Sequence, residues 1–259
     1  MTGVKNPAVL LLHGFLGSPQ NWRACAETLS ARYRVLVPEL PIFSGRQPAE
    51  CQEHVLRFLV EQIAAAKARQ WVVIGNSLGG TLAVHLAQRE PERVIGLVLT
   101  GSGGLFQPKP SWIFYRRPGR EWLRGCVREI FFDEAMVTEA MVDELQAIFR
   151  DRKKFIEVVR LAKNIRRMSV QETLPRVHCP VLLVWGAEDK VTPPDTANDF
   201  KQLLPDAEVH FLSRCGHAPM MERPAEFNRL VTDFLQRIAA RSGAIYASRQ
   251  AGHDLMSRT

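Results

Sequence analysis

A serine between two glycines is the first residue whose setting suggests chemistry. Residues 75–79 have the sequence GNSLG, which fits the pattern G-x-S-x-G. In that pattern the serine lies on a sharp turn from a strand into a helix, with its hydroxyl exposed. An apolar run, Trp71–Ile74, precedes Ser77, and a helical pattern over Leu78–Glu90 follows it. We therefore predict that Ser77 is a nucleophile; the alternative is a glycine-rich turn whose serine caps the helix.

A serine hydroxyl is a weak nucleophile and needs a neighbouring base. His217 directly follows the last expected strand, and Asp189 follows the expected strand Pro180–Trp185. Both therefore lie at the carboxyl edge of a parallel sheet, where such sheets place their sites. A carboxylate there fixes the tautomer of the histidine and stabilises its charged form. We predict a catalytic triad of Ser77, Asp189 and His217 for acyl transfer, and prefer Asp189 to the adjacent Glu188.

A third loop, after the first apolar run, carries the sequence His13-Gly14-Phe15. Acyl transfer needs hydrogen-bond donors aimed at the oxygen that becomes negative in the transition state. We predict that the backbone N–H groups of Phe15 and Leu78 form this oxyanion hole. His13 is expected to hold the loop by hydrogen bonds rather than to act as a base.

Strand and helix patterns alternate on both sides of a long interruption. Strands alternating with helices indicate a parallel sheet, and continuously apolar strands indicate burial on both faces. We predict an α/β fold with a mostly parallel, doubly wound sheet of about six strands. The expected strands are Ala8–Leu12, Arg34–Val37, Trp71–Ile74, Val94–Thr100, Pro180–Trp185 and Glu208–Leu212; the expected helices are Trp22–Arg32, His54–Ala68, Leu78–Glu90, Thr196–Leu204 and Ala225–Ala240.

The interruption is a helical, basic and aromatic segment over residues 105–175. Helical spacing there predicts helices over Glu121–Phe132, Thr138–Phe149 and Lys153–Met168. We expect residues 1–104 and 176–241 to form the sheet-containing core and 105–175 an inserted helical unit. Residues 242–259 are polar and without periodicity, so we expect a mobile tail there.

Composition narrows the class of protein further. Among 259 residues, 46% are hydrophobic and 24% are charged, which is typical of a globular protein. No apolar run approaches the roughly 18 residues of a membrane span, and the net charge of +7 accompanies no nucleic-acid-binding motif. Five cysteines without a CxxC pair argue against disulfides and a zinc site. We expect a cytoplasmic monomer or homodimer without metal or cofactor, acting on a small molecule and binding neither membrane nor nucleic acid.

Four motifs in order resemble those of α/β-hydrolases over about residues 8–240. They are LHGF at 12–15, GNSLGG at 75–80, WGAED at 185–189 and CGH at 215–217. The resemblance implies the order Ser77, Asp189, His217 and makes residues 105–175 a helical cap over the active site. Only seven residues precede Ala8, so we expect the N-terminal hairpin of the family to be missing and the sheet to have about six strands rather than eight.

The motifs resemble those of more than one subfamily. The serine motif and the segment Glu222–Phe227 resemble carbon–carbon bond hydrolases of ring-cleavage products, small carboxylesterases and a menaquinone-pathway synthase. Carbon–carbon hydrolases usually carry Trp after the catalytic histidine, where this chain has Ala218, and Gly-Pro-Gly where residues 15–17 are FLG. We therefore expect a serine carboxylesterase for small to medium esters. The alternatives are a carbon–carbon hydrolase or thioesterase and, last, a non-catalytic receptor on the same fold.

Aromatic residues of the expected cap suggest a substrate pocket. We predict that Trp112, Phe114 and Trp122 line an apolar pocket together with Met220; the alternative is that they pack the cap onto the core. The cap arginines could bind a substrate carboxylate or be surface charges. They are Arg116, Arg117, Arg120 and Arg124.

Overall fold

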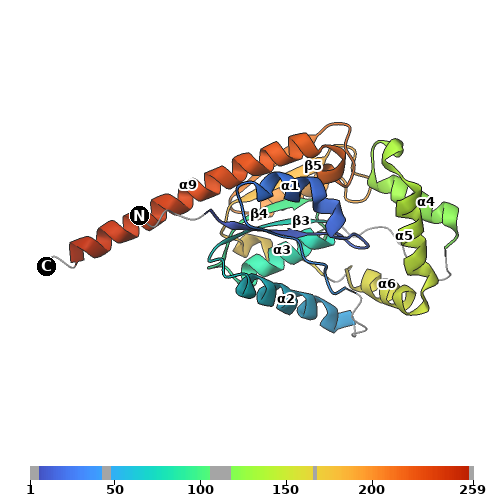
Figure 1. Ribbon diagram of the computed structural model, residues 1–259, viewed down its shortest axis with the longest axis horizontal. Coiled ribbons are helices and arrows are strands. Elements are labelled where there is room, and N and C mark those ends of the chain that lie inside the picture. Colours follow the sequence, from blue (N-terminus) through green and yellow to red (C-terminus); the bar gives the residue numbers. More distant parts are fainter. Residues whose placement is uncertain (1–5, 43–47, 106–117, 166–167, 257–259) are drawn as a thin grey trace.

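The described residues fold around one sheet of parallel strands (Figure 1). This computed structural model describes residues 6–42, 48–105, 118–165 and 168–256. The strand order is β2-β1-β3-β4-β5-β6, and every neighbouring pair is parallel, which confirms the predicted fold class. The strands are β1 (Ala8–Leu12), β2 (Val35–Leu36), β3 (Trp71–Asn76), β4 (Val94–Thr100), β5 (Val181–Gly186) and β6 (Ala207–Leu212).

The strand order brings two of the predicted loops together. The chain passes from β1 outward to β2 and then returns to the other side of β1 for β3. In open α/β sheets, ligands bind outside the carboxyl ends of the strands where the order reverses in this way. Here that point lies between β1 and β3, whose register pairs Leu12 with Gly75. The loops that carry Gly14 and Ser77 therefore leave the sheet side by side.

Helices cover both faces of the sheet. One face carries α2 (Pro48–Ala65), α3 (Leu78–Arg89) and α7 (Asp195–Leu203), and the other carries α1 (Arg23–Ser30) and α9 (Pro224–Met256). Consecutive strand residues point to opposite faces. Leu10 accordingly packs in the core beneath α2 and α3, while Val9 and Leu11 pack in the core beneath α1 and α9. All three are fully buried, which explains why β1 is apolar at every position.

Three helices between β4 and β5 form what we call the α4–α6 segment. They lie together to one side of the sheet (Figure 1) and begin and end within three residues of their predicted bounds. Their buried side chains, among them Leu123, Val142 and Val158, join the apolar core on the α1 and α9 face. The helices are α4 (Arg120–Ile130), α5 (Glu139–Arg150) and α6 (Arg152–Ile165); short helical turns are η1 (Pro19–Trp22), η3 (Glu134–Met136), η4 (Leu174–Arg176) and α8 (Pro219–Glu222).

Two helices are longer than their sequence patterns predict. Helix α2 begins at Pro48 rather than His54, and proline is favoured in the first turn of a helix because its missing N–H has no intrahelical partner there. Helix α9 continues to Met256 rather than ending at Ala240, and its last turns project beyond the sheet (Figure 1). The mobility of this end stays a prediction. Within the described ranges, no helix combines the length and apolar character needed to cross a membrane.

Candidate active site

Ser77 lies between the end of β3 and the start of α3 in a strained conformation. Its φ of 55° and ψ of −117° are unusual for a residue with a side chain. The turn is tight because glycines flank it. A Cβ on Gly79 would lie 2.2 Å from the Leu12 carbonyl oxygen, and one on Gly75 would lie 2.3 Å from the Gly79 carbonyl oxygen. The glycines therefore allow the close backbone packing that presents the Ser77 side chain.

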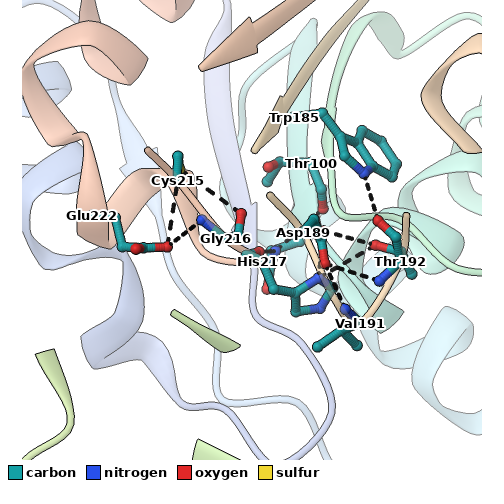
Figure 2. A network of polar contacts seen from close by, with 10 residues as sticks. Thr100, Trp185, Asp189, Val191, Thr192, Cys215, Gly216, His217 and Glu222 are labelled. Atoms are coloured by element: carbon teal, nitrogen blue, oxygen red, sulfur yellow. Dashed lines mark hydrogen bonds and ion pairs between the residues drawn. The ribbon is translucent and has the colours of Figure 1, made fainter. Parts of the chain in front are cut away.

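His217 and Asp189 meet at the carboxyl edge of the sheet, as the sequence predicts (Figure 2). His217 Nδ1–H donates to Asp189 Oδ2 at 2.9 Å, and the two residues are only 6% and 4% exposed. Three other groups hold the carboxylate. Oδ1 accepts from the Val191 and Thr192 N–H groups at 2.8 and 2.9 Å, and Oδ2 accepts from Thr192 Oγ1 at 3.0 Å. This arrangement leaves His217 Nε2 as the nitrogen that can take a proton.

The backbone of His217 is attached to the residue next to the serine. Asn76 Nδ2 donates to the His217 carbonyl oxygen at 2.9 Å and to the Thr100 carbonyl oxygen at 3.2 Å. The imidazole also lies against Gly101, where a Cβ would come within 2.7 Å of the ring. These contacts place the three predicted triad residues at one edge of the sheet. Sequence reasoning missed Asn76, although it occupies the variable position before the serine in the G-x-S-x-G pattern.

The loop after β1 lies directly against Ser77. A Cβ on Gly14 would come within 3.1 Å of Ser77 Cβ, so the Phe15 N–H belongs to the same corner of the sheet. Leu78 is the first residue of α3, and the N–H groups of the first helical turn have no acceptor within the helix. Both N–H groups are in positions that suit donors to a developing negative charge. Their assignment to an oxyanion hole is consistent with this placement and stays a prediction.

His13 holds this loop in place. Its Nδ1–H donates to the Gly14 carbonyl oxygen at 2.9 Å, and its Nε2 accepts from the Leu40 N–H at 3.2 Å. Burial lowers the pKa of the imidazole, which keeps Nε2 unprotonated and available as an acceptor. Both ring nitrogens are thus occupied by backbone groups, and His13 is not placed to serve as the base.

Cys215 is a thiol close in sequence to the predicted triad, two residues before His217. It is completely buried, and burial raises the pKa of its thiol. A buried thiol of raised pKa is a poor nucleophile, because the reactive species is the thiolate. All five cysteines are free. Among the residues that the structure describes, no three His, Cys, Asp or Glu side chains are grouped so that they could hold a metal ion.

The predicted substrate-binding residues have different placements. Trp112 and Phe114 lie outside the described residues. Trp122, on α4, is 39% exposed, whereas Met220 is buried in the core beneath α1 and α9. A role in substrate binding stays a prediction for each of them.

Two arginines of the α4–α6 segment bind acidic residues of the protein itself. Arg120 donates to Glu139 at 2.6 Å and also pairs with Asp143, while Arg124 pairs with Glu139. These two arginines therefore match the surface-charge alternative better than a role in binding a substrate carboxylate. Arg116 and Arg117 lie outside the described residues.

Comparison with known proteins places this geometry in a family. The model of the alpha/beta hydrolase family matches residues 9–230. A 2-hydroxy-6-oxo-6-phenylhexa-2,4-dienoate hydrolase from Burkholderia cepacia is 27% identical over 252 residues, covering 88% of this chain and 87% of that protein. A 2-hydroxy-6-oxononadienedioate/2-hydroxy-6-oxononatrienedioate hydrolase from Dechloromonas aromatica (strain RCB) is 30% identical over 251 residues, covering 88% and 86%.

A solved structure also indicates similarity to alpha/beta hydrolases. An alpha/beta hydrolase enzyme from the metagenome of sediments from the lagoon of Mar Chica, Morocco, is 31% identical to this chain. The two superpose with a TM-score of 0.71 over 90% of this chain and 91% of that one. The similarity thus extends over nearly the whole length of both proteins.

Proposed function

Because the chain belongs to the alpha/beta hydrolase family, we propose that it is a serine hydrolase that cleaves a carbon–carbon bond in 2-hydroxy-6-oxo-dienoate substrates. The observation that carries the serine chemistry is the buried His217–Asp189 hydrogen bond beside the strained turn of Ser77. The substrate class is carried by the relatives, two of which are named for hydrolysis of such dienoates.

The triad would act in two steps. His217 Nε2 takes the proton of Ser77 Oγ as this oxygen attacks the substrate carbonyl carbon. The N–H groups of Phe15 and Leu78 stabilise the negative oxygen. The bond from the carbonyl carbon to the neighbouring carbon then breaks, and that carbon takes a proton from His217. A water molecule, activated by the same base, releases the carboxylic acid and restores the Ser77 hydroxyl.

Hydrolysis of a carboxylic ester is the second candidate. The same steps apply, except that the leaving atom is an alcohol oxygen rather than a carbon. The observation that favours it is Ala218 directly after His217, where the carbon–carbon hydrolases usually carry a tryptophan. The sequence motifs alone favour ester hydrolysis. The names of the relatives favour hydrolysis of a carbon–carbon bond, which we therefore propose first.

The experiment compares the two bond types in one preparation. Purified protein is given 2-hydroxy-6-oxo-6-phenylhexa-2,4-dienoate, followed by loss of its conjugated chromophore, and p-nitrophenyl esters of graded acyl length. We expect the higher kcat/KM on the dienoate, and we expect Ser77→Ala to lower kcat by about 10⁴-fold or more on either substrate. A higher kcat/KM on an ester would make the ester reading the correct one, and full turnover by Ser77→Ala would contradict both.

A further inference from the structure

The loop of His217 is hydrogen-bonded to the end of α4. The His217 N–H donates to the carbonyl oxygen of Ile130, the last residue of α4, at 2.7 Å. Carbonyl groups at the end of a helix have no intrahelical partner, so the backbone of His217 satisfies one of them. The α4–α6 segment is thus attached to the very residue that the proposed mechanism uses as base.

The Glu222 carboxylate makes a second connection between the same two segments. Its Oε1 accepts from the Gly216 N–H at 2.7 Å, on the His217 loop. Its Oε2 accepts from the Phe132 N–H at 2.8 Å and from the Asp133 N–H at 3.4 Å, just beyond α4. Both oxygens are therefore used, one on each side of the contact.

The two segments are packed without spare room at this point. A Cβ on Gly216 would lie 2.5 Å from the Ile130 carbonyl oxygen and 2.9 Å from the Phe132 nitrogen. The glycine therefore allows an approach that no other residue could make. A contact this close transmits a displacement of α4 to the loop rather than absorbing it.

We propose that Glu222 is a positioning residue, which locks the His217 loop to the end of α4 and so lets the α4–α6 segment set the orientation of the base. This inference rests on the proposed function, because it matters to catalysis only if His217 is the base. The site needs a carboxylate rather than an amide. Glutamine would keep one acceptor oxygen but turn an NH₂ group toward N–H donors, and hydrogen bonds to an ionised acceptor are the stronger ones.

The test compares Glu222→Gln with Glu226→Gln, in which an exposed glutamate at the start of α9 loses the same charge. The readouts are kcat and KM on the substrate that the wild type turns over, and the rate at which a small phosphonate labels Ser77. We expect Glu222→Gln to lower both kcat and the labelling rate by about 10- to 100-fold, because a misplaced catalytic group costs this much. KM should stay within about twofold, and Glu226→Gln should match the wild type.

Several outcomes would overturn the proposal. One is a folded Glu222→Gln protein that labels and turns over at the wild-type rate; another is a rise in KM alone. If Glu222→Gln does not fold, Glu222→Asp is measured instead, since it keeps the charge but is too short to reach both sides. Loss of the fold in both variants would make Glu222 a stability residue and nothing more. A wild type that neither labels nor turns over would instead refute the proposed function itself.

Discussion

The Asp189–His217 pair and the pairs of Arg120 and Arg124 with Glu139 both join segments distant in the chain. The first pair is almost completely buried, and backbone N–H groups of two further residues hold its carboxylate. In the second group the Glu139 side chain is 61% exposed, and only arginine side chains bind it among the contacts of the described residues.

The difference shows where geometry is fixed and where it is free. A buried carboxylate with every oxygen occupied has one orientation, which is what a base beside a nucleophile requires. The surface pairs do change titration, because the two arginines lower the pKa of Glu139 to about 2. The Glu139 carboxylate is largely solvated, so it can nevertheless exchange these partners for water at little cost. The buried pair is therefore expected to control activity, and the surface pairs to control very little.

Asp189→Asn should have the largest effect on activity. The asparagine keeps the shape of the site, but its NH₂ group can face the Nδ1–H of His217 and favours the wrong tautomer. We expect kcat to fall by about 10⁴-fold with the fold retained. Steady-state kinetics checks this, with circular dichroism as the control for folding. A loss below tenfold would mean that Asp189 does not orient the base.

Two glycine substitutions test how tightly the backbone is packed at the Ser77 turn and in α4. The quantity compared is the free energy of unfolding. A Cβ on Gly79 would meet the Leu12 backbone, whereas one on Gly125, within α4, would have no atom within 4 Å. We expect Gly79→Ala to cost about 3 kcal/mol or more, through backbone overpacking. Gly125→Ala should gain about 0.5–1 kcal/mol, because alanine is the better helix former.

Urea unfolding of both variants and the wild type measures this difference. Equal effects of the two substitutions would contradict the tight packing inferred around the Ser77 turn. A loss on Gly125→Ala alone would indicate that another group covers this face of α4.

Glu139→Gln should have the smallest effect. It removes both arginine pairs, yet kcat should be unchanged and the urea midpoint should move only slightly. Since the folded-state pKa of Glu139 is lowered, its contribution to stability is present above pH 4.5 and is lost as the pH falls toward 2. The small difference between wild type and Glu139→Gln should therefore shrink over that window and in high salt. A clear loss of kcat would show that these pairs hold the site after all.

Much of the fold and the position of the site could be predicted from the sequence. The inner strands β1, β3, β4 and β5 are almost continuously apolar because both faces of the sheet are buried there. Ser77, Asp189 and His217 each follow a strand. Parallel strands bring such residues to one edge whatever the details of the loops. The end of α9 could not be predicted in this way. A helix is recognised by its buried face, and this end extends beyond the sheet (Figure 1).

The supporting contacts of the site could not be predicted either. Thr192, Asn76 and Glu222 contact groups on other loops. These contacts depend on how the loops pack against each other, and no residue spacing in the sequence predicts that packing. The sequence motifs also do not indicate which bond of a substrate would be cleaved. They predict a nucleophile and a base but not the leaving atom, so the choice between an ester and a carbon–carbon bond rests on the relatives.

The most direct test of the central claim is mass spectrometry of the protein after reaction with a small serine-reactive phosphonate. We predict a single adduct on the peptide that contains Ser77 in the wild type, and a labelling rate reduced by about 10³-fold or more in His217→Ala. Labelling at another residue, or labelling at Ser77 that proceeds equally fast without His217, would contradict the assignment of this pair as nucleophile and base.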